Sequence, residues 1–248
     1  MTTDVRVLSA GEQGIVVEFG SAIDPDINRR VHQLGRALGE RKSLGILEVV
    51  PTYRSLLVYF DPLCISRKLL TQEITQLAHM TDTREAQTGG ARVIAIPVCY
   101  GGEFGEDLAF VAKHNNLTEA EVIDIHTSAA YQVYMLGFTP GFPYLGGMSE
   151  KIATPRLEKP RTRIPAGSVG IAGSQTGFYP IESPGGWQLI GRTPVKAFDP
   201  AAQNPFLFAA GDYLKFEAIS QEEYHTIKQA VDAGNYKPVI ASFKGGDK

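Results

Sequence analysis

Four apolar segments with strand character open the chain. Val, Ile, Leu and Phe dominate residues 5–10, 14–20, 45–50 and 55–60, and glycine, proline or polar residues bound these segments. The pattern predicts two pairs of strands, and each pair is joined by a short turn.

Two helices are predicted, one between the strand pairs and one after them. Asp24 can cap the first helix, Pro25 suits its first turn, and Ser66 can cap the second. The helical spacing places one apolar face on each helix, made by Ile27, Val31, Leu34 and Leu38 in the first and by Leu70, Ile74 and Leu77 in the second. This order predicts a small α+β domain with its helices on one face of an antiparallel sheet.

A polar stretch at residues 81–90 lacks any periodicity and is the best candidate for a linker. We therefore predict two domains, at 1–85 and 86–240. The second domain is expected to contain a strand at 91–100, helices near 106–114 and 118–129, short β segments up to about residue 216 and a closing helix at 220–231. Short strands separated by Gly and Pro turns predict a barrel or a sandwich.

Composition limits the class of function. The chain has 248 residues, of which 43% are apolar and 21% charged, and its net charge is −3. This balance indicates a globular protein and gives no reason to expect nucleic acid or a membrane as a partner. Two cysteines provide neither a disulfide framework nor a zinc site. The amino terminus lacks the features of a signal peptide, and no run of 18 apolar residues occurs, so we expect a cytoplasmic protein.

Glycine and proline concentrate in one window. Residues 137–194 hold 11 of the 26 glycines and 8 of the 15 prolines. The window begins with the uncharged segment "GFTPGFPYLGGM" at 137–148, which can form neither a regular helix nor a membrane span. A loop of this composition gives a rigid, dry wall that can approach a small ligand or a partner closely.

His126 is the first residue that could carry chemistry. It lies four residues after Val122 on the apolar face of a helix that Thr118 and Glu121 can start with a capping box. A buried structural histidine is one interpretation. The other is a general base or a substrate ligand, since a neutral imidazole in a dry site can titrate near pH 7.

Four arginines lie among the prolines and glycines of the same window, at Arg156, Arg161, Arg163 and Arg192. Arginine suits bidentate binding of carboxylate or phosphate, although these side chains can also form an ordinary solvated rim. The segment "SPGGW" at 183–187 offers either adjacent amides for an anion or a tight turn that anchors Trp187.

Several familiar motifs are absent from the sequence. "GSVGIAG" does not have the dinucleotide spacing, and no P-loop occurs. "AGSVG" around Ser168 departs from a nucleophile elbow, because Ala166 replaces the first glycine and an apolar run follows. The residues alone therefore indicate no standard catalytic machinery.

Two long motifs resemble the KipI family. They are "HTSAAYQVYMLGFTPGFPYLGGM" at 126–148 and "PRLEKPRTRIPAGSVGIAGSQTGFYPIESPGGWQLIGRTP" at 155–194, and "PTYRSLLVYFDP" in the first half also fits. Members of this family are described as the B subunit of bacterial 5-oxoprolinase, as allophanate hydrolase subunit 1 or as a kinase inhibitor. The resemblance implies a ferredoxin-like α/β amino-terminal domain and a cyclophilin-like β-barrel carboxyl-terminal domain.

The resemblance also implies an activity and partners. The expected function is that of the B subunit of an ATP-dependent 5-oxoprolinase, which hydrolyses 5-oxo-L-proline to L-glutamate together with A and KipA-type C subunits. ATP, with Mg²⁺, would be a co-substrate, and no metal-ligand set is predicted in this chain. The alternatives are an inhibitor of a sensor histidine kinase and a subunit of an enzyme that processes urea or allophanate.

The candidate site residues fall into two groups. The candidate catalytic residues are His126, Arg163 and Arg192. The candidate substrate-binding or nucleotide-binding residues are Phe138, Tyr144, Arg156, Ser168, Gln175, Ser183, Gly185 and Gly186.

Overall fold

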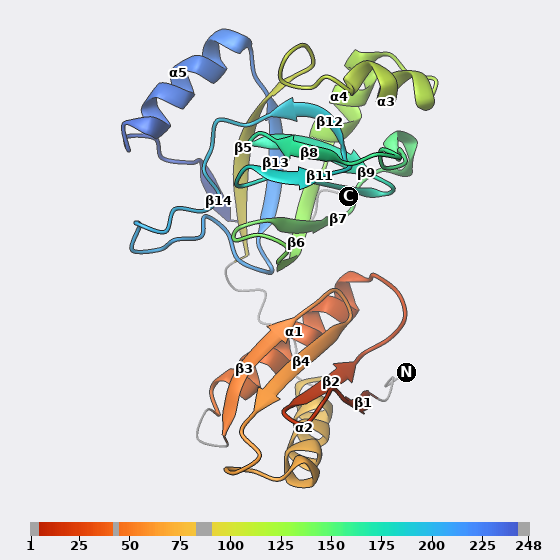
Figure 1. Cartoon of the computed structure of the whole chain (residues 1–248), viewed down its shortest axis with the longest axis vertical. Coiled ribbons are helices and arrows are strands. Elements are labelled where there is room, and N and C mark those ends of the chain that lie inside the picture. Colours follow the sequence, from red (N-terminus) through yellow and green to blue (C-terminus); the bar gives the residue numbers. More distant parts are fainter. Residues whose placement is uncertain (1–4, 42–44, 83–90, 243–248) are drawn as a thin grey trace. The chain divides into compact units, whose positions relative to one another are not determined.

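The computed structural model describes residues 5–41, 45–82 and 91–242. The chain divides into two compact units, Met1–Gly89 and Gly90–Lys248 (Figure 1). The boundary predicted after residue 85 falls within 83–90, which lie outside the described residues, so that boundary stays a prediction.

The first unit is an antiparallel sheet with both helices on one face. The strands lie in the order β1-β2-β4-β3, and all neighbouring strands are antiparallel. Alternate residues of β2 and β4, among them Val17 and Val58, pack with both helices in one core, as predicted. The elements are β1 (Arg6–Ser9), β2 (Gly14–Glu18), α1 (Pro25–Gly39), β3 (Ile46–Pro51), β4 (Ser55–Phe60) and α2 (Arg67–Asp82).

Side chains cap three helices at the predicted residues. Asp24 Oδ1 accepts hydrogen bonds from the two amides that follow Pro25. Ser66 Oγ accepts one from the amide of Leu69 at 3.4 Å. Thr118 and Glu121 form the expected capping box at the start of α4. Each cap satisfies donors that a helix leaves unpaired at its amino end.

The second unit is built on a nearly closed, barrel-like sheet. Its strand order is β10-β9-β12-β5-β13-β6-β7, with β14 also paired to β5, and the end strands β7 and β10 contact each other. Strands β8 and β11 form a separate ribbon. The strands are β5 (Arg92–Tyr100), β6 (Ala130–Leu136), β7 (Pro143–Gly146), β8 (Arg161–Ile164), β9 (Ser168–Ala172), β10 (Gln175–Phe178), β11 (Ser183–Gly185), β12 (Gln188–Arg192), β13 (Tyr213–Ala218) and β14 (Ile240–Ser242).

The helices of this unit also agree with the sequence prediction to within two residues at each end. They are α3 (Leu108–His114), α4 (Glu119–Ser128) and α5 (Gln221–Asp232), with a 3-10 turn, η2, at Glu150–Ile152. Mixed α/β structure with a barrel-like sheet is thus confirmed.

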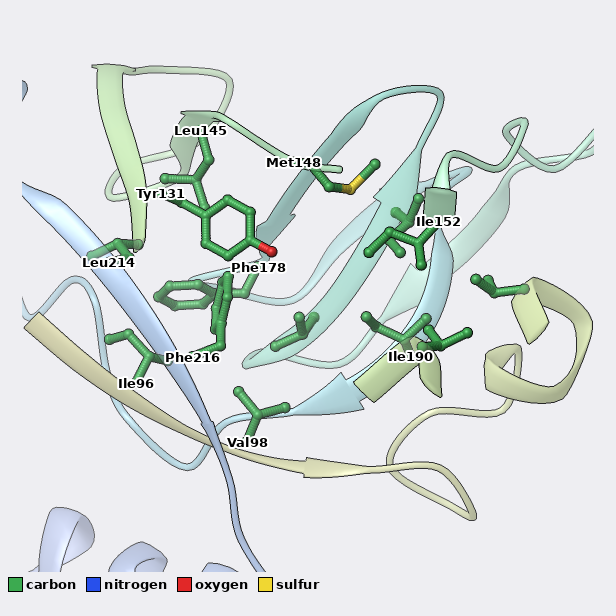
Figure 2. Packing of buried hydrophobic residues seen from close by; sticks show 14 of the residues in the cluster. Ile96, Val98, Tyr131, Leu145, Met148, Ile152, Phe178, Ile190, Leu214 and Phe216 are labelled. Atoms are coloured by element: carbon green, nitrogen blue, oxygen red, sulfur yellow. The ribbon is translucent and has the colours of Figure 1, made fainter. Parts of the chain in front are cut away.

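Strands β9, β10 and β12 are buried on both faces. Val169, Ile171, Phe178 and Ile190 point into the large interior core, part of which Figure 2 shows. A second cluster lies on the opposite face of these strands and consists of Phe142, Ile164, Ala172, Tyr179, Trp187 and Leu189, with Tyr144 packed against it. We call this second set the aromatic cluster.

Glycine lets Trp187 lie close to the strands. A Cβ at Gly170 would be 2.9 Å from the carbonyl oxygen of Gln188 and 3.2 Å from Cβ of Trp187. A Cβ at Gly177 would be 3.5 Å from the indole ring. Gly170 therefore has a packing role, because a larger residue would force β9 and the chain at Trp187 apart, and Gly177 has one toward β7, because its Cβ would be 3.1 Å from the carbonyl oxygen of Pro143.

We predict that Gly170→Ala lowers the free energy of unfolding of the second unit by about 1–3 kcal/mol, because the added methyl group meets backbone that cannot move aside. Trp187 is the only tryptophan in the chain, so its fluorescence during urea unfolding reports this change. Gly186→Ala is the matched control. The nearest atom to its added Cβ would be 3.6 Å away, and its φ lies outside the left-handed range. Equal stability of the two variants would contradict this packing role.

Candidate functional site

His126 lies inside the barrel, fully buried in the last turn of α4. Its Nδ1 is 2.7 Å from the hydroxyl of Tyr100, and its Nε2 is 2.7 Å from Oγ1 of Thr176. The Thr176 hydroxyl donates its one proton to the carbonyl of Gly170 at 3.0 Å. It must therefore accept from Nε2–H of His126, and Nδ1 accepts from Tyr100.

This environment keeps the imidazole neutral. Burial lowers the pKa of His126 from 6.5 to about 3. The ring stacks on Phe216 with a centroid distance of 4.6 Å, and the hydroxyl of Tyr131 donates to the carbonyl of His126. Both ring nitrogens are thus engaged in the core, which favours the structural interpretation of His126. Its catalytic role stays a prediction.

The aromatic cluster lies on the other face of the same strands. Phe142 is at its centre, with ring centroids 5.3 Å from Tyr144, 5.6 Å from Tyr179 and 5.6 Å from Trp187. All three contacts are edge-to-face, which is a favoured geometry for aromatic rings. Trp187 is 7% exposed, so the segment "SPGGW" does anchor Trp187 in a core.

The "SPGGW" segment is also committed to internal contacts. A Cβ at Gly185 would lie 2.3 Å from the hydroxyl of Tyr179, and the carbonyl of Gly186 accepts from the amide of Leu157 at 2.8 Å. Ser183 is buried, and its hydroxyl donates to the carbonyl of Ile181. These contacts explain the small residues structurally, while their predicted role in ligand binding stays a prediction.

The uncharged loop after β6 is fixed at one end and open at the other. Phe142 is buried in the aromatic cluster, whereas Phe138 is 63% exposed. Phe138 has a φ of 62°, which is rare and costly for a residue with a side chain. The backbone of this loop therefore presents an aromatic ring on the surface.

The four arginines have four different environments. Nη2 of Arg161 lies 2.9 Å from both carboxylate oxygens of Asp107, and its Nε lies 3.0 Å from Glu106. Asp107 also accepts from the amide of Leu189. Arg161 therefore joins β8 to the start of α3 and to β12, as a structural residue.

Arg163 and Arg156 lie nearer to solvent. Arg163 pairs with Glu182 at 2.7 Å, but its side chain is 76% exposed, as in an ordinary surface ion pair. Arg156 is exposed near the aromatic cluster. Burial raises the pKa of Tyr179 to about 12, and the positive charge of Arg156 opposes that rise.

Ser168 and Arg192 lie directly opposite each other on β9 and β12. Arg192 in turn is paired with Cys99 on β5, so the three residues form a row across the sheet. Arg192 is partly buried, its guanidinium lies 5.8 Å from the ring centroid of Phe104, and Nη2 donates to the carbonyl of Glu103.

Two polar atoms of this row have no hydrogen-bond partner. They are Oγ of the fully buried Ser168 and Nε of Arg192. Most buried polar groups in folded proteins are paired, so these two neighbouring donors mark a candidate binding site. Two predicted site residues far apart in sequence are thus brought together, whereas the sheet separates them from the interior where His126 lies.

Sequence reasoning missed several neighbours of these sites. Cys99, Phe104 and Tyr224 form a small cluster beside Arg192, and Phe206 flanks the exposed loop. No local signal in the sequence could have identified them, because strand register and chain folding bring them into place. Gln175, at the start of β10, is partly buried, and its predicted role in binding stays a prediction.

No group of three or more His, Cys, Asp or Glu suited to a metal ion occurs among the described residues. Within the same part of the chain, no helix is long and apolar enough to cross a membrane.

Residues 5–208 match the family model described as the carboxyltransferase domain, subdomain C and D, and the chain belongs to this family. The chain is 46% identical over 237 residues to the 5-oxoprolinase B subunit of Bacillus subtilis (strain 168), covering 92% of this chain and 99% of that protein. It is 41% identical over 219 residues to the 5-oxoprolinase B subunit of Escherichia coli O157:H7, covering 88% and 97%. These matches confirm the family resemblance that the sequence motifs indicated.

A solved structure supports the fold. The crystal structure of the protein TTHA0988 is 38% identical, with a TM-score of 0.75 over 84% of this chain. The match covers 40% of the TTHA0988 chain. In that protein the counterpart of this chain is therefore joined to a longer stretch of further polypeptide.

We predict that the buried His126 makes the stability of the second unit depend on pH. Below pH 6.5 the unfolded chain binds a proton at this residue, whereas the folded chain does so only near pH 3. The free energy of unfolding therefore falls as the pH falls through this window, by about 2 kcal/mol between pH 6.5 and 5. His126→Gln should show a shallower fall in urea unfolding followed across this range.

The exposed His114 offers a matched control, His114→Gln. An identical pH slope in wild type and His126→Gln would contradict the prediction. The same variant tests catalysis, because near-normal activity of a folded His126→Gln would exclude a catalytic imidazole.

Proposed function

We propose that this chain is the B subunit of an ATP-dependent 5-oxoprolinase, which hydrolyses 5-oxo-L-proline to L-glutamate with A and KipA-type C subunits. The observation that carries the proposal is the identity of 46% over 99% of a named B subunit. ATP with Mg²⁺ acts as co-substrate of the complex, which we place in the cytoplasm. The proposal does not require ATP to bind to this chain.

The proposal includes a finer description of the fold. The first unit has the element order ββαββα, which is the βαββαβ order of the ferredoxin-like motif with its last strand moved to the front. We propose that this unit is a permuted ferredoxin-like domain, that the second is a cyclophilin-like barrel, and that the domain boundary lies after residue 85.

The substrate chemistry suits the outer face of the barrel sheet. 5-Oxoproline is a planar lactam with a carboxylate, so its site needs an apolar wall and a fixed cation. Tyr144, partly buried at the edge of the aromatic cluster, and the exposed Arg156 near that cluster offer an aromatic surface and a cation of this kind. Arg192 and Ser168 together offer two unpaired donors, which suit a carboxylate.

We assign the carboxylate of the substrate to Arg192 and Ser168. Arg192 approaches Phe104 and the carbonyl of Glu103, which hold its guanidinium in place. A preorganised cation of this kind binds an anion without first having to be ordered. Arg163 lacks this enclosure, because its side chain is largely exposed.

Reconstitution tests the function directly. We expect glutamate release from 5-oxoproline and ATP only when this chain is combined with purified A and C subunits, because the chain holds only part of the machinery. Each subunit is omitted in turn and the released glutamate measured. Normal turnover by this chain alone would contradict the proposal, as would a complete, stable complex that releases no glutamate.

Arg192→Lys should lower kcat/KM of the reconstituted enzyme roughly tenfold to a hundredfold, because an ammonium lacks the planar fork of donors. Arg163→Lys is the matched control and should behave nearly as wild type, since Arg163 lies in solvent. Thermal unfolding shows whether each variant folds. Equal kinetics for the two variants would refute the assignment of Arg192.

A further inference from the structure

The two unpaired donors beside each other on β9 and β12 are closed off from solvent. Oγ of Ser168 and Nε of Arg192 are both buried, although neither has a hydrogen-bond partner. We call these two atoms the donor pair. Cys99 lies directly opposite Arg192 on β5 and packs in one cluster with Phe104 and Tyr224. A ligand can reach the donor pair only after part of this surrounding structure moves, because a buried atom has no free approach.

Phe104 and Tyr224 are the aromatic neighbours of Arg192. The guanidinium lies 5.8 Å from the ring centroid of Phe104, and the Phe104 ring is 4.6 Å from that of Tyr224. Burial raises the pKa of the Tyr224 hydroxyl, and the positive charge of Arg192 opposes that rise, so Tyr224 also lies close to the guanidinium. Tyr224 belongs to α5, which Figure 1 shows at the margin of the second unit.

The turn that carries Phe104 is fixed to the sheet. The amide of Gly101 donates to the carbonyl of Ile190 on β12 at 3.1 Å. A Cβ at Gly105 would lie only 2.1 Å from the same carbonyl oxygen. The backbone of this turn therefore lies directly on β12, and Phe104 cannot move aside without disturbing a closely packed contact.

The helix that carries Tyr224 is held more weakly. Of the twelve residues of α5, all of which the structure describes, only Tyr224 is buried. Gln221 Nε2 donates to Glu103 Oε1 at 3.1 Å, but this hydrogen bond is exposed and adds little. The capping box of Ser220 and Glu223 completes the first turn of α5 without help from the sheet. Lifting α5 therefore costs chiefly the burial of one aromatic side chain.

Both ends of the α5 segment are tied to the same strand. β13 before α5 and β14 after it are both paired with β5, so the helix can lift while its ends stay in place. Gly234, two residues after α5, has a φ of 72° and no atom within 4 Å of a Cβ built on it. Residues just beyond a helix end commonly absorb the change in backbone angles when a segment opens and closes.

We propose that α5 is a movable cover of the donor pair and that Tyr224 is the positioning residue that closes it. The cover lifts to admit the carboxylate of a ligand to Arg192 and Ser168, and it closes once both donors are paired. Tyr224 acts through Phe104, on which its ring packs beside the guanidinium. The proposal rests on the proposed function, which assigns the substrate carboxylate to these two donors.

Cys99 reports whether the cover lifts. It is buried in one cluster with Tyr224, whereas Cys64 of the first unit is exposed and serves as an internal control. Alkylation of the full-length chain by iodoacetamide is followed by peptide mass spectrometry, which distinguishes the two thiols. We expect slow alkylation of Cys99 whose rate depends on urea much less steeply than global unfolding does, because lifting one helix exposes little surface.

Variants of Tyr224 test its part in closing the cover. Tyr224→Ala should speed the alkylation of Cys99 by about tenfold or more and leave that of Cys64 unchanged, because α5 loses its buried side chain. Tyr224→Phe keeps the ring and should behave as wild type. Tyr213→Ala is the matched control, since Tyr213 is partly buried at the end of β13 remote from α5. Thermal unfolding shows whether each variant folds.

The effect of the ligand is measured in the complex assembled with A and C subunits. 5-Oxoproline should slow the alkylation of Cys99, because the cover closes on the bound carboxylate. 2-Pyrrolidone, the same lactam without a carboxylate, should not. Tyr224→Ala should raise the KM for 5-oxoproline by about tenfold or more with a smaller change in kcat, whereas Tyr224→Phe should keep the wild-type KM.

Several results would overturn the proposal. One is a urea dependence of Cys99 alkylation equal to that of global unfolding, and another is a wild-type alkylation rate in Tyr224→Ala. An active complex in which 5-oxoproline leaves Cys99 unprotected would show that the substrate binds elsewhere. Protection of Cys99 by 5-oxoproline without any glutamate release would support the cover while refuting the proposed function. Neither protection nor glutamate release would refute both.

Discussion

The close approach of Trp187 to Gly170 is the constraint on which much of the second unit depends. The chain at Trp187 can lie this close to β9 because Gly170 has no side chain, while Gly177 on β10 lets the carbonyl of Pro143 approach. Phe142 packs edge-on against the indole and ties the uncharged loop to the sheet. The loop that carries Phe138 is therefore tied, through Phe142 and Trp187, to Gly170 in another strand. The loop gains rigidity from this packing, since its own sequence forms no regular element.

A series of hydrogen-bonded polar groups lies inside the same sheet, and each of these groups has a partner. Tyr100, His126, Thr176 and the carbonyl of Gly170 form consecutive hydrogen bonds between β5, α4, β10 and β9. Such a series is compatible with an apolar core because every member is paired, whereas one unpaired group there would cost stability. Burial also holds the imidazole neutral. The histidine that the motif makes conspicuous thus joins four elements of the barrel.

The arginines between residues 137 and 194 show how the environment decides the role of one residue type. Arg161 is enclosed by two carboxylates and a carbonyl and joins three elements. Arg163 has a single carboxylate in solvent and contributes little. Arg192 keeps a buried donor without a partner beside an equally unpaired serine. Only the last arrangement leaves a buried donor unpaired, whereas the remaining donors of Arg163 lie in solvent.

The sequence by itself determined the local elements. Apolar periodicity, the caps at Asp24 and Thr118 and the Gly and Pro turns act over a few residues, so strands and helices could be predicted with their order and their core faces. Long motifs also sufficed for the family. Tertiary structure alone decided the site, because the pairing of Ser168 with Arg192 depends on strand register across β9 and β12. The same holds for His126 and Phe138, which lie near each other in sequence yet point respectively into the core and into solvent. A side chain's neighbours, and hence its charge state and free donors, are set by contacts between distant segments that no local pattern records.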